Sequence, residues 1–261
     1  MSLIDSIILG IVQGITEFFP ISSSGHLVIV EKFLDLPVKQ MLSFDVYVHF
    51  GSLLAIFLYF RKDIFKIVFD FFNLIKLGKY KDIRNNQLFY ICIATIPAVL
   101  VGLLIKPYFG ENFRSEILVG AMMILTALFF VITEKFKKKK SKLNLKHSWL
   151  IGLSQALAIL PGVSRSGMTI STGVYLGIEK EKAARFSFLI GSIAILGATI
   201  LSLMDLSNTT LLIDYKTLIV GVVSSFVASI FAIHFLLKIV KKKSLIVFSL
   251  YLVIVGIIIL S

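Results

Sequence analysis

The stretch QGITEFFPISSSGHL, residues 13–27, decides the fold of the chain. It sets a carboxylate (Glu17), an amide (Gln13) and an imidazole (His26) between the apolar segments SIILGIV and LVIV. Polar groups in apolar surroundings are destabilising unless they find partners, so these side chains must meet other polar groups in the fold. Pro20 interrupts the helical pattern, which predicts two short helices joined by a loop.

The stretch occurs a second time, as GLSQALAILPGVSRSGMT in residues 152–169. When Gln13 is aligned with Gln155, several serines and glycines coincide, but the acid and the imidazole have no counterpart. The second copy instead carries a cation, Arg165, at the position of Ser23. A weaker repeat, GSLLAIF against GSIAILG, follows in the same order. These matches predict a duplicated half. The two copies share a backbone pattern, but the first carries the acid and the imidazole and the second carries the cation.

The composition predicts a protein that crosses a membrane several times. Of the 261 residues, 57 % are apolar and 16 % charged, and the mean hydropathy is +0.93. No basic segment is followed by a cleavage site, so we expect no removable signal peptide. The one cysteine, Cys92, cannot form an intrachain disulfide.

Apolar runs of two lengths follow one another along the chain. The long runs are near the 17–25 residues that a membrane-spanning helix needs; they cover residues 44–60, 87–105, 116–133, 186–204, 217–237 and 244–260. The shorter segments form two pairs, each joined by a serine-rich loop: 3–18 with 24–34, and 148–160 with 166–178. Short paired segments broken by proline and glycine predict half-membrane helices that enter and return on one side.

The basic residues are distributed unevenly between these runs. Residues 61–86, 135–147, 179–185 and 238–243 hold 21 of the 27 lysines and arginines, which predicts that these stretches are cytoplasmic. Within the first of them, residues 64–75 predict an amphipathic helix lying along the interface. The net charge of +12 therefore belongs to solvated loops near anionic lipid, and we expect no nucleic-acid partner.

Together these patterns predict an all-α membrane protein with a single membrane domain, residues 1–261. Residues 1–134 and 148–261 form two repeats of opposite orientation, joined by the basic cytoplasmic connector 135–147. We expect an inverted-topology repeat with six transmembrane helices and two re-entrant helical hairpins. The broken tips of the hairpins should then meet near the midplane of the membrane and form a site.

Arg165 is the first candidate residue of that site, because an arginine in a membrane segment costs about 2.5–3.5 kcal/mol. One interpretation is an ion pair with Glu17 that only fastens the hairpins together. The other is a clamp for an anion, since guanidinium binds phosphate through two parallel hydrogen bonds. Small and hydroxyl residues at a helix N-terminus also favour phosphate, and four of them surround Arg165: Ser164, Ser166, Gly167 and Thr169.

The first copy offers a cation site and a reactive group. Gln13 and Glu17 are four residues apart and share a helical face, and a carboxylate with an amide oxygen suits a divalent cation such as Mg²⁺ or Ca²⁺. Gln13 is weaker evidence, because Gln155 has no acidic partner and is consistent with a packing amide. His26 suits a general acid or base, a nucleophile, or a buried histidine bonded to a carbonyl group.

The serines of the first loop differ in what they predict. Ser22 and Ser24 have serine counterparts, which favours helix capping and, together with Gly25, a cradle for phosphate. Ser23 is singled out because its counterpart is Arg165. Two further histidines in the apolar runs, His49 and His234, are interpreted as packing or rim residues.

Two classes of function fit these features. Inverted repeats, broken helices and an anion site are typical of a secondary transporter, or of a flippase for an anionic lipid. The acid and imidazole beside the anion clamp favour an enzyme, since a carrier needs no acid–base pair.

QGITEFFPISSSGHL and PGVSRSGMTIS resemble the two signature motifs of the undecaprenyl-diphosphate phosphatases of the bacitracin-resistance type. The resemblance also includes FDVYVHFGSLLA and covers the whole chain. It implies a multi-pass enzyme of the bacterial plasma membrane that hydrolyses the terminal phosphate of a C55 polyprenyl diphosphate. This reaction recycles the lipid carrier for cell-wall synthesis and confers bacitracin resistance, and the resemblance implies an active site that faces outward.

The resemblance also implies roles for individual residues. It makes Glu17, Ser23, His26 and Arg165 catalytic, and it pairs Gln13 with Glu17 in the acidic motif. The partners it implies are undecaprenyl diphosphate and membrane lipid, and the sequence is compatible with a homodimer. His49 departs from the family pattern, because it replaces a glutamine common in other members.

The predicted topology can be tested by labelling single cysteines from either side of the membrane. We expect a cysteine at Ser141, in the basic connector, to react only with reagent on the cytoplasmic side. A cysteine at Asn208 should react only from outside. Labelling of both from the same side would contradict two repeats of opposite orientation.

Overall fold

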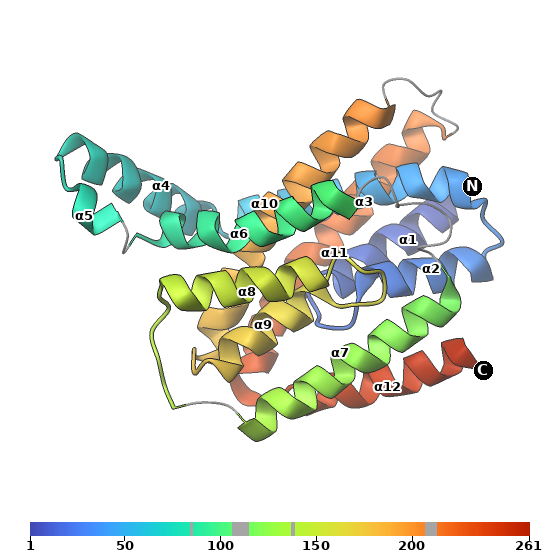
Figure 1. The fold of residues 1–261 in the computed structure, drawn as a ribbon. Coiled ribbons are helices and arrows are strands. Elements are labelled where there is room, and N and C mark those ends of the chain that lie inside the picture. The colour runs from blue at the N-terminus through green and yellow to red at the C-terminus, as the bar shows by residue number, and fades with distance from the viewer. Residues whose placement is uncertain (84–85, 106–114, 137–138, 207–212) are drawn as a thin grey trace.

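The computed structural model describes residues 1–83, 86–105, 115–136, 139–206 and 213–261, and the regular elements of these residues are all helices (Figure 1). The helices are α1 (Leu3–Thr16), α2 (Ser23–Phe33), α3 (Val38–Tyr59), α4 (Arg61–Lys76), α5 (Tyr80–Ile83), α6 (Gln87–Ile105), α7 (Glu116–Phe136), α8 (Leu145–Leu157), α9 (Arg165–Tyr175), α10 (Lys180–Leu206), α11 (Tyr215–Lys242) and α12 (Ile246–Leu260). The predicted labelling site Asn208 lies outside the described residues.

Each predicted apolar segment forms a helix, and the predicted amphipathic stretch 64–75 falls within α4. The largest difference at the start of the chain is in α3, which begins at Val38 rather than near residue 44. Pro37 precedes its first turn with an extended backbone, a position in which a helix tolerates proline.

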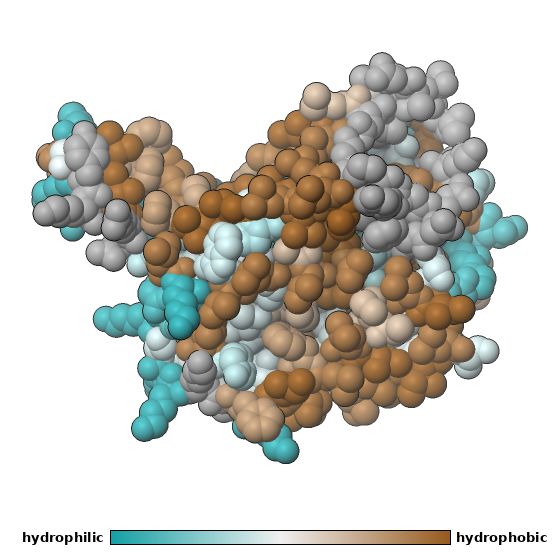
Figure 2. All heavy atoms as spheres, in the orientation of Figure 1, coloured by the Kyte–Doolittle hydropathy of each residue, from teal (hydrophilic) through white to brown (hydrophobic). Residues whose placement is uncertain are grey.

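Five helices of the described chain are long and apolar enough to cross a membrane: Met41–Tyr59, Gln87–Ile105, Glu116–Phe136, Lys180–Ser202 and Tyr215–Lys242. The remaining predicted span, α12, has 15 residues and is about 22 Å long, less than the hydrocarbon thickness of about 30 Å. Hydrophobic side chains also cover much of the surface, with hydrophilic residues toward the left and right edges of the view (Figure 2). The chain is a multi-pass membrane protein.

Helix α4 projects away from the rest of the helices together with α5 (Figure 1). It buries only Ile67, whereas Phe65, Phe69 and Phe72 are exposed. An apolar stripe on a helix that the protein leaves uncovered matches the interfacial helix that the sequence predicts.

The two short-helix pairs, α1–α2 and α8–α9, use the same device to begin their second helix. Ser22 Oγ accepts a hydrogen bond from the Gly25 N–H at 3.3 Å, and Ser164 Oγ accepts one from the Gly167 N–H at 3.1 Å. These four residues are aligned in the sequence repeat. The predicted capping role is confirmed for Ser22, and Ser164 caps α9 in the same way. Ser24, also predicted to cap, instead lies inside α2.

Helices from the two sequence halves pack against each other in matched pairs. Helix α1 packs on α11, and its counterpart α8 packs on α6. Helix α7 packs on α12, lying side by side in Figure 1, and α3 packs on α10. Close approach is possible because glycines face the partner backbone: a Cβ on Gly14 would lie 2.5 Å from Ser225 O, and one on Gly152 2.5 Å from Ala94 O.

We expect Gly152→Ala to destabilise the protein by about 1–3 kcal/mol, because the new methyl group must push α8 away from the α6 backbone. The measurement is the midpoint of thermal unfolding in detergent. Gly197→Ala is the matched control, since nothing lies within 4 Å of its Cβ position. That control should be neutral or stabilising by about 0.5–1 kcal/mol. Equal midpoints for the two variants would contradict the close packing of α8 on α6.

Candidate active site

The two serine-rich loops lie against each other near the centre of the view in Figure 1. Ser24 Oγ of the first loop region accepts a hydrogen bond from the Gly162 N–H at 3.3 Å. In the other direction, Ser166 Oγ donates to the Phe19 carbonyl oxygen at 3.3 Å. The predicted contact between the tips is therefore present, and it is made by residues of both hairpins.

Glu17 is the centre of the polar contacts at this junction. It lies at the C-terminal end of α1 and is 7 % exposed. Its Oε1 accepts a hydrogen bond from Arg165 Nη2 of the other hairpin. Its Oε2 accepts from Ser23 Oγ at 2.7 Å and from Gln13 Nε2 at 3.1 Å. The predicted residues Gln13, Glu17, Ser23 and Arg165 thus converge on one buried carboxylate.

The Arg165 side chain lies in a narrow space against α10. It is the first residue of α9, its side chain is 15 % exposed, and its Nη1 donates to the Ser187 carbonyl oxygen at 3.3 Å. A Cβ on Gly191 of α10 would lie 1.5 Å from Nη1, so this position has room for glycine alone. The ion pair that fastens the hairpins is therefore formed, and its guanidinium group is fixed in place.

Thr169 and Ser166 support the start of α9. Thr169 Oγ1 donates to the Arg165 carbonyl oxygen at 2.9 Å and lies 2.6 Å from Ser187 Oγ. Ser166 Oγ lies 3.3 Å from Ser164 Oγ. Because all four hydroxyl residues are buried and bonded within the protein, their geometry fixes the helix terminus that carries Arg165.

His26 has two partners that differ from those of Glu17. Its Nδ1 lies 2.7 Å from the Ser22 carbonyl oxygen, and its Nε2 lies 2.7 Å from the hydroxyl of Tyr251 on α12, with the two rings stacked. A carbonyl group only accepts, so Nδ1 carries the hydrogen, and in neutral imidazole Nε2 accepts from Tyr251. The carbonyl bond was one of the predicted alternatives, whereas sequence reasoning missed Tyr251.

His49 is the other residue whose proximity to Glu17 sequence reasoning missed, since it was interpreted only as a packing or rim residue. Its Nε2 lies 3.6 Å from Glu17 Oε2, and its Nδ1 lies 2.6 Å from the Asp45 carbonyl oxygen. The signal in the sequence was its place in FDVYVHFGSLLA, a polar residue in an apolar run just before the weaker repeat.

This arrangement has the parts of a phosphoryl-transfer site. Ser23 directs its hydroxyl hydrogen at a buried carboxylate, which is the geometry of a nucleophile paired with a base. Arg165 supplies a fixed positive charge on the same carboxylate. Across the described residues, no three His, Cys, Asp or Glu side chains form a metal-binding group, so a cation here would also use amide or hydroxyl oxygens.

Comparison with known proteins agrees with the motifs. The family model described as "Bacitracin resistance protein BacA" matches residues 6–258. The chain belongs to the BacA family. Among curated relatives, the undecaprenyl-diphosphatase of Methanobrevibacter smithii is 39 % identical, covering 99 % of this chain and 97 % of the relative. Proteins of the same name from Korarchaeum cryptofilum and Christiangramia forsetii are 40 % and 41 % identical, covering 100 % and 98 % of this chain and 99 % and 96 % of the relatives.

The contact between Glu17 and Arg165 generates a stability prediction. Arg165→Met leaves the buried carboxylate without its cation and should destabilise the protein by about 3–5 kcal/mol. Adding Glu17→Gln removes the unpaired charge, so the double variant should recover at least about 1 kcal/mol relative to Arg165→Met alone. The measurement is unfolding in detergent for both single variants and the double variant. Additive effects would contradict a direct interaction.

Proposed function

We propose that this BacA-family protein hydrolyses a polyprenyl diphosphate, undecaprenyl diphosphate in the cell, to the monophosphate and phosphate. The observation that carries the proposal is the junction of Ser23, Glu17 and Arg165, a nucleophile–base pair beside a fixed guanidinium group. The curated relatives named undecaprenyl-diphosphatase support the choice of substrate. The reaction recycles the lipid carrier of cell-wall synthesis, and this recycling accounts for bacitracin resistance.

In the proposed mechanism, Arg165 and the N-terminus of α9 hold the diphosphate. Helix N-termini and guanidinium groups both favour phosphate oxygens. The Ser23 hydroxyl attacks the terminal phosphorus and passes its proton to Glu17 Oε2, while the bridging P–O bond breaks and the lipid monophosphate leaves. Water then releases the phosphate from Ser23. His26, whose Nε2 accepts from the exposed Tyr251, is the proposed proton carrier. Fixed charges stabilise the transferring group throughout.

A divalent cation fits the donor atoms of the site. Gln13 Oε1 is buried and has no hydrogen-bond partner, and it belongs to the amide whose Nε2 contacts Glu17. Carboxylate and amide oxygens are the ligands that Mg²⁺ and Ca²⁺ prefer. Glu17 and Gln13 would hold the ion, which when bound offsets the charge of the diphosphate.

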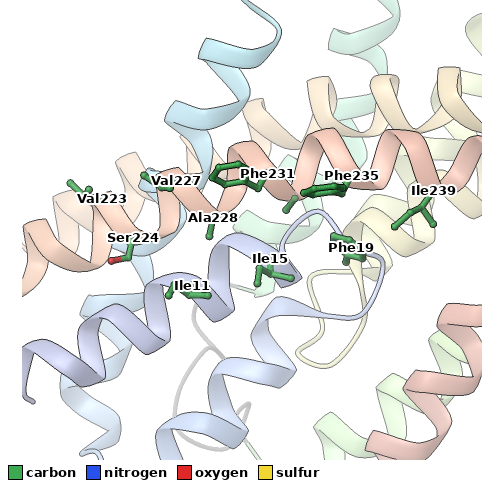
Figure 3. A pocket seen from close by; sticks show the side chains of 11 residues that line it. Ile11, Ile15, Phe19, Val223, Ser224, Val227, Ala228, Phe231, Phe235 and Ile239 are labelled. Atoms are coloured by element: carbon green, nitrogen blue, oxygen red, sulfur yellow. The ribbon is translucent and has the colours of Figure 1, made fainter.

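An apolar groove of about 840 Å³ leads away from the junction and suits the polyprenyl chain. It lies between α1 and α11, and Phe19 of the first loop stands at one end (Figure 3). The other end is lined by Ile11 and Val223, and the lining between them is almost wholly apolar. A chain lying in this groove would place its diphosphate beside Glu17, two residues before Phe19.

The membrane arrangement is part of the same proposal. The matched packing of α1 on α11 and α8 on α6 supports two repeats of residues 1–134 and 148–261 in opposite orientation. In this arrangement the two helix pairs are re-entrant hairpins, α12 is the sixth span, and the connector 135–147 is cytoplasmic. The site opens toward the outer face of the plasma membrane.

Phosphate release by the purified protein in detergent tests the proposal and the role of Arg165 together. We expect the wild type to release phosphate from undecaprenyl diphosphate, which a carrier without hydrolase activity would not do. Arg165→Lys keeps the charge but loses bidentate geometry, so kcat/KM should fall by about 100-fold or more, roughly 3 kcal/mol. Near-normal turnover would show that Arg165 does not bind the diphosphate and that its ion pair with Glu17 is only structural.

Gly191→Ala provides a second test of the same role without touching the arginine itself. The added methyl group must displace the guanidinium, so activity should fall although Arg165 is intact. Gly197→Ala on the same helix is the matched control and should keep wild-type turnover.

The groove predicts a dependence on chain length. Val227→Trp fills the groove away from Phe19, so it should raise KM for undecaprenyl diphosphate by about fivefold or more, roughly 1 kcal/mol. Hydrolysis of methyl diphosphate, which has no tail to enter the groove, should be unchanged. Val247→Trp, at an exposed position on α12, is the control. Equal effects on both substrates would place the long chain elsewhere.

A further inference from the structure

We propose that His49 is a nitrogen ligand of the catalytic cation, so that the site has a mixed nitrogen and oxygen donor set. The proposal rests on the function given above for the role of that cation. It adds a residue to the site and predicts a preference for a first-row transition ion such as Mn²⁺ over Ca²⁺.

The hydrogen bonding of His49 fixes which nitrogen faces the site. Its Nδ1 lies 2.6 Å from the Asp45 carbonyl oxygen, and a carbonyl group only accepts, so Nδ1 carries the hydrogen. The lone pair of the neutral ring is then on Nε2. Histidines that bind metals almost always donate their other ring N–H to a carbonyl, a carboxylate or water in this way.

The distance from His49 to Glu17 suits a cation bound between the two side chains. Nε2 lies 3.6 Å from Glu17 Oε2, which is too long for a direct hydrogen bond. In the neutral ring both atoms present lone pairs, so the pair suits a shared cation. Arg165 bonds to the other carboxylate oxygen, Oε1, so the cation would bind at Oε2, the oxygen that accepts from Ser23 and Gln13.

Gln13 supplies a further oxygen ligand, and cation binding would explain why its Oε1 has no hydrogen-bond partner. Its Oε1 is buried without a partner, while its Nε2 donates to Glu17 Oε2. Turning the amide over would place Oε1 beside Oε2, where the two oxygens repel each other unless a cation lies between them. The ion would then take the place of the hydrogen bond from Gln13, while Ser23 keeps its hydrogen bond to the second lone pair of Oε2.

The exposure of these groups allows an ion to enter. The Glu17 side chain is 6 % exposed, but that of His49 is 28 % exposed, so the histidine forms the open side of the site. Three protein donors leave coordination positions for phosphate oxygens, as expected where a divalent ion acts on a phosphorylated substrate.

The test is electron spin echo spectroscopy of Mn²⁺ bound to the purified protein in detergent, because a directly coordinated imidazole gives a ¹⁴N modulation. The chain has four histidines, so each can be replaced in turn. We expect the modulation in the wild type and in the control His147→Gln, at a half-buried position in the first turn of α8. It should be absent in His49→Gln and His49→Asn, whose amides can still coordinate through oxygen.

Affinity gives an independent readout from the same samples. His49→Gln should weaken Mn²⁺ binding about tenfold or more while changing Ca²⁺ binding far less, since Ca²⁺ gains little from nitrogen. Gel filtration of each variant checks folding. Full ¹⁴N modulation in the folded His49 variants would overturn the proposal, as would Mn²⁺ bound to the wild type without modulation, or no Mn²⁺ binding at millimolar concentration. Phosphate release is measured separately, so a working hydrolase without ¹⁴N modulation refutes the ligand role alone.

Discussion

The buried ion pair between Glu17 and Arg165 is the interaction on which the rest of the site depends. A carboxylate that is 7 % exposed in an apolar helical protein requires a cation, and the cation comes from the other half of the chain. The pair therefore fixes the relative position of the two hairpins. It also places Ser23 beside a base and a positive charge. The ion pair that stabilises the buried carboxylate therefore also forms the catalytic site.

The two loops share a backbone pattern but carry different functional side chains, and this difference explains how such a site arises. Both loops begin their second helix with a serine that caps the glycine three residues later. Identical loops would bring two acids or two cations together, which repel each other. Because the first copy has Glu17 and the second has Arg165, the same pairing of loops becomes attractive, and neither half can form the site alone.

Much of this could be predicted from the sequence, because apolar length, proline breaks and the repeat are properties of local stretches. The helix ranges, the meeting of the loops and the convergence of Gln13, Glu17, Ser23 and Arg165 followed from them. Tyr251 and His49 did not, since their roles depend on where α12 and α3 lie relative to the loops. The narrow space at Gly191 is likewise visible only once α9 and α10 are packed.

The central claim is that both hairpins hold one diphosphate between them. The most direct measurement is a structure by electron cryo-microscopy of the protein with a polyprenyl methylenediphosphonate, in which carbon replaces the bridging oxygen and hydrolysis is blocked. The account predicts the terminal phosphonate within hydrogen-bond distance of both Arg165 and Ser23, with the tail in the groove between α1 and α11. A headgroup bound away from Arg165, with the ion pair to Glu17 undisturbed, would contradict it.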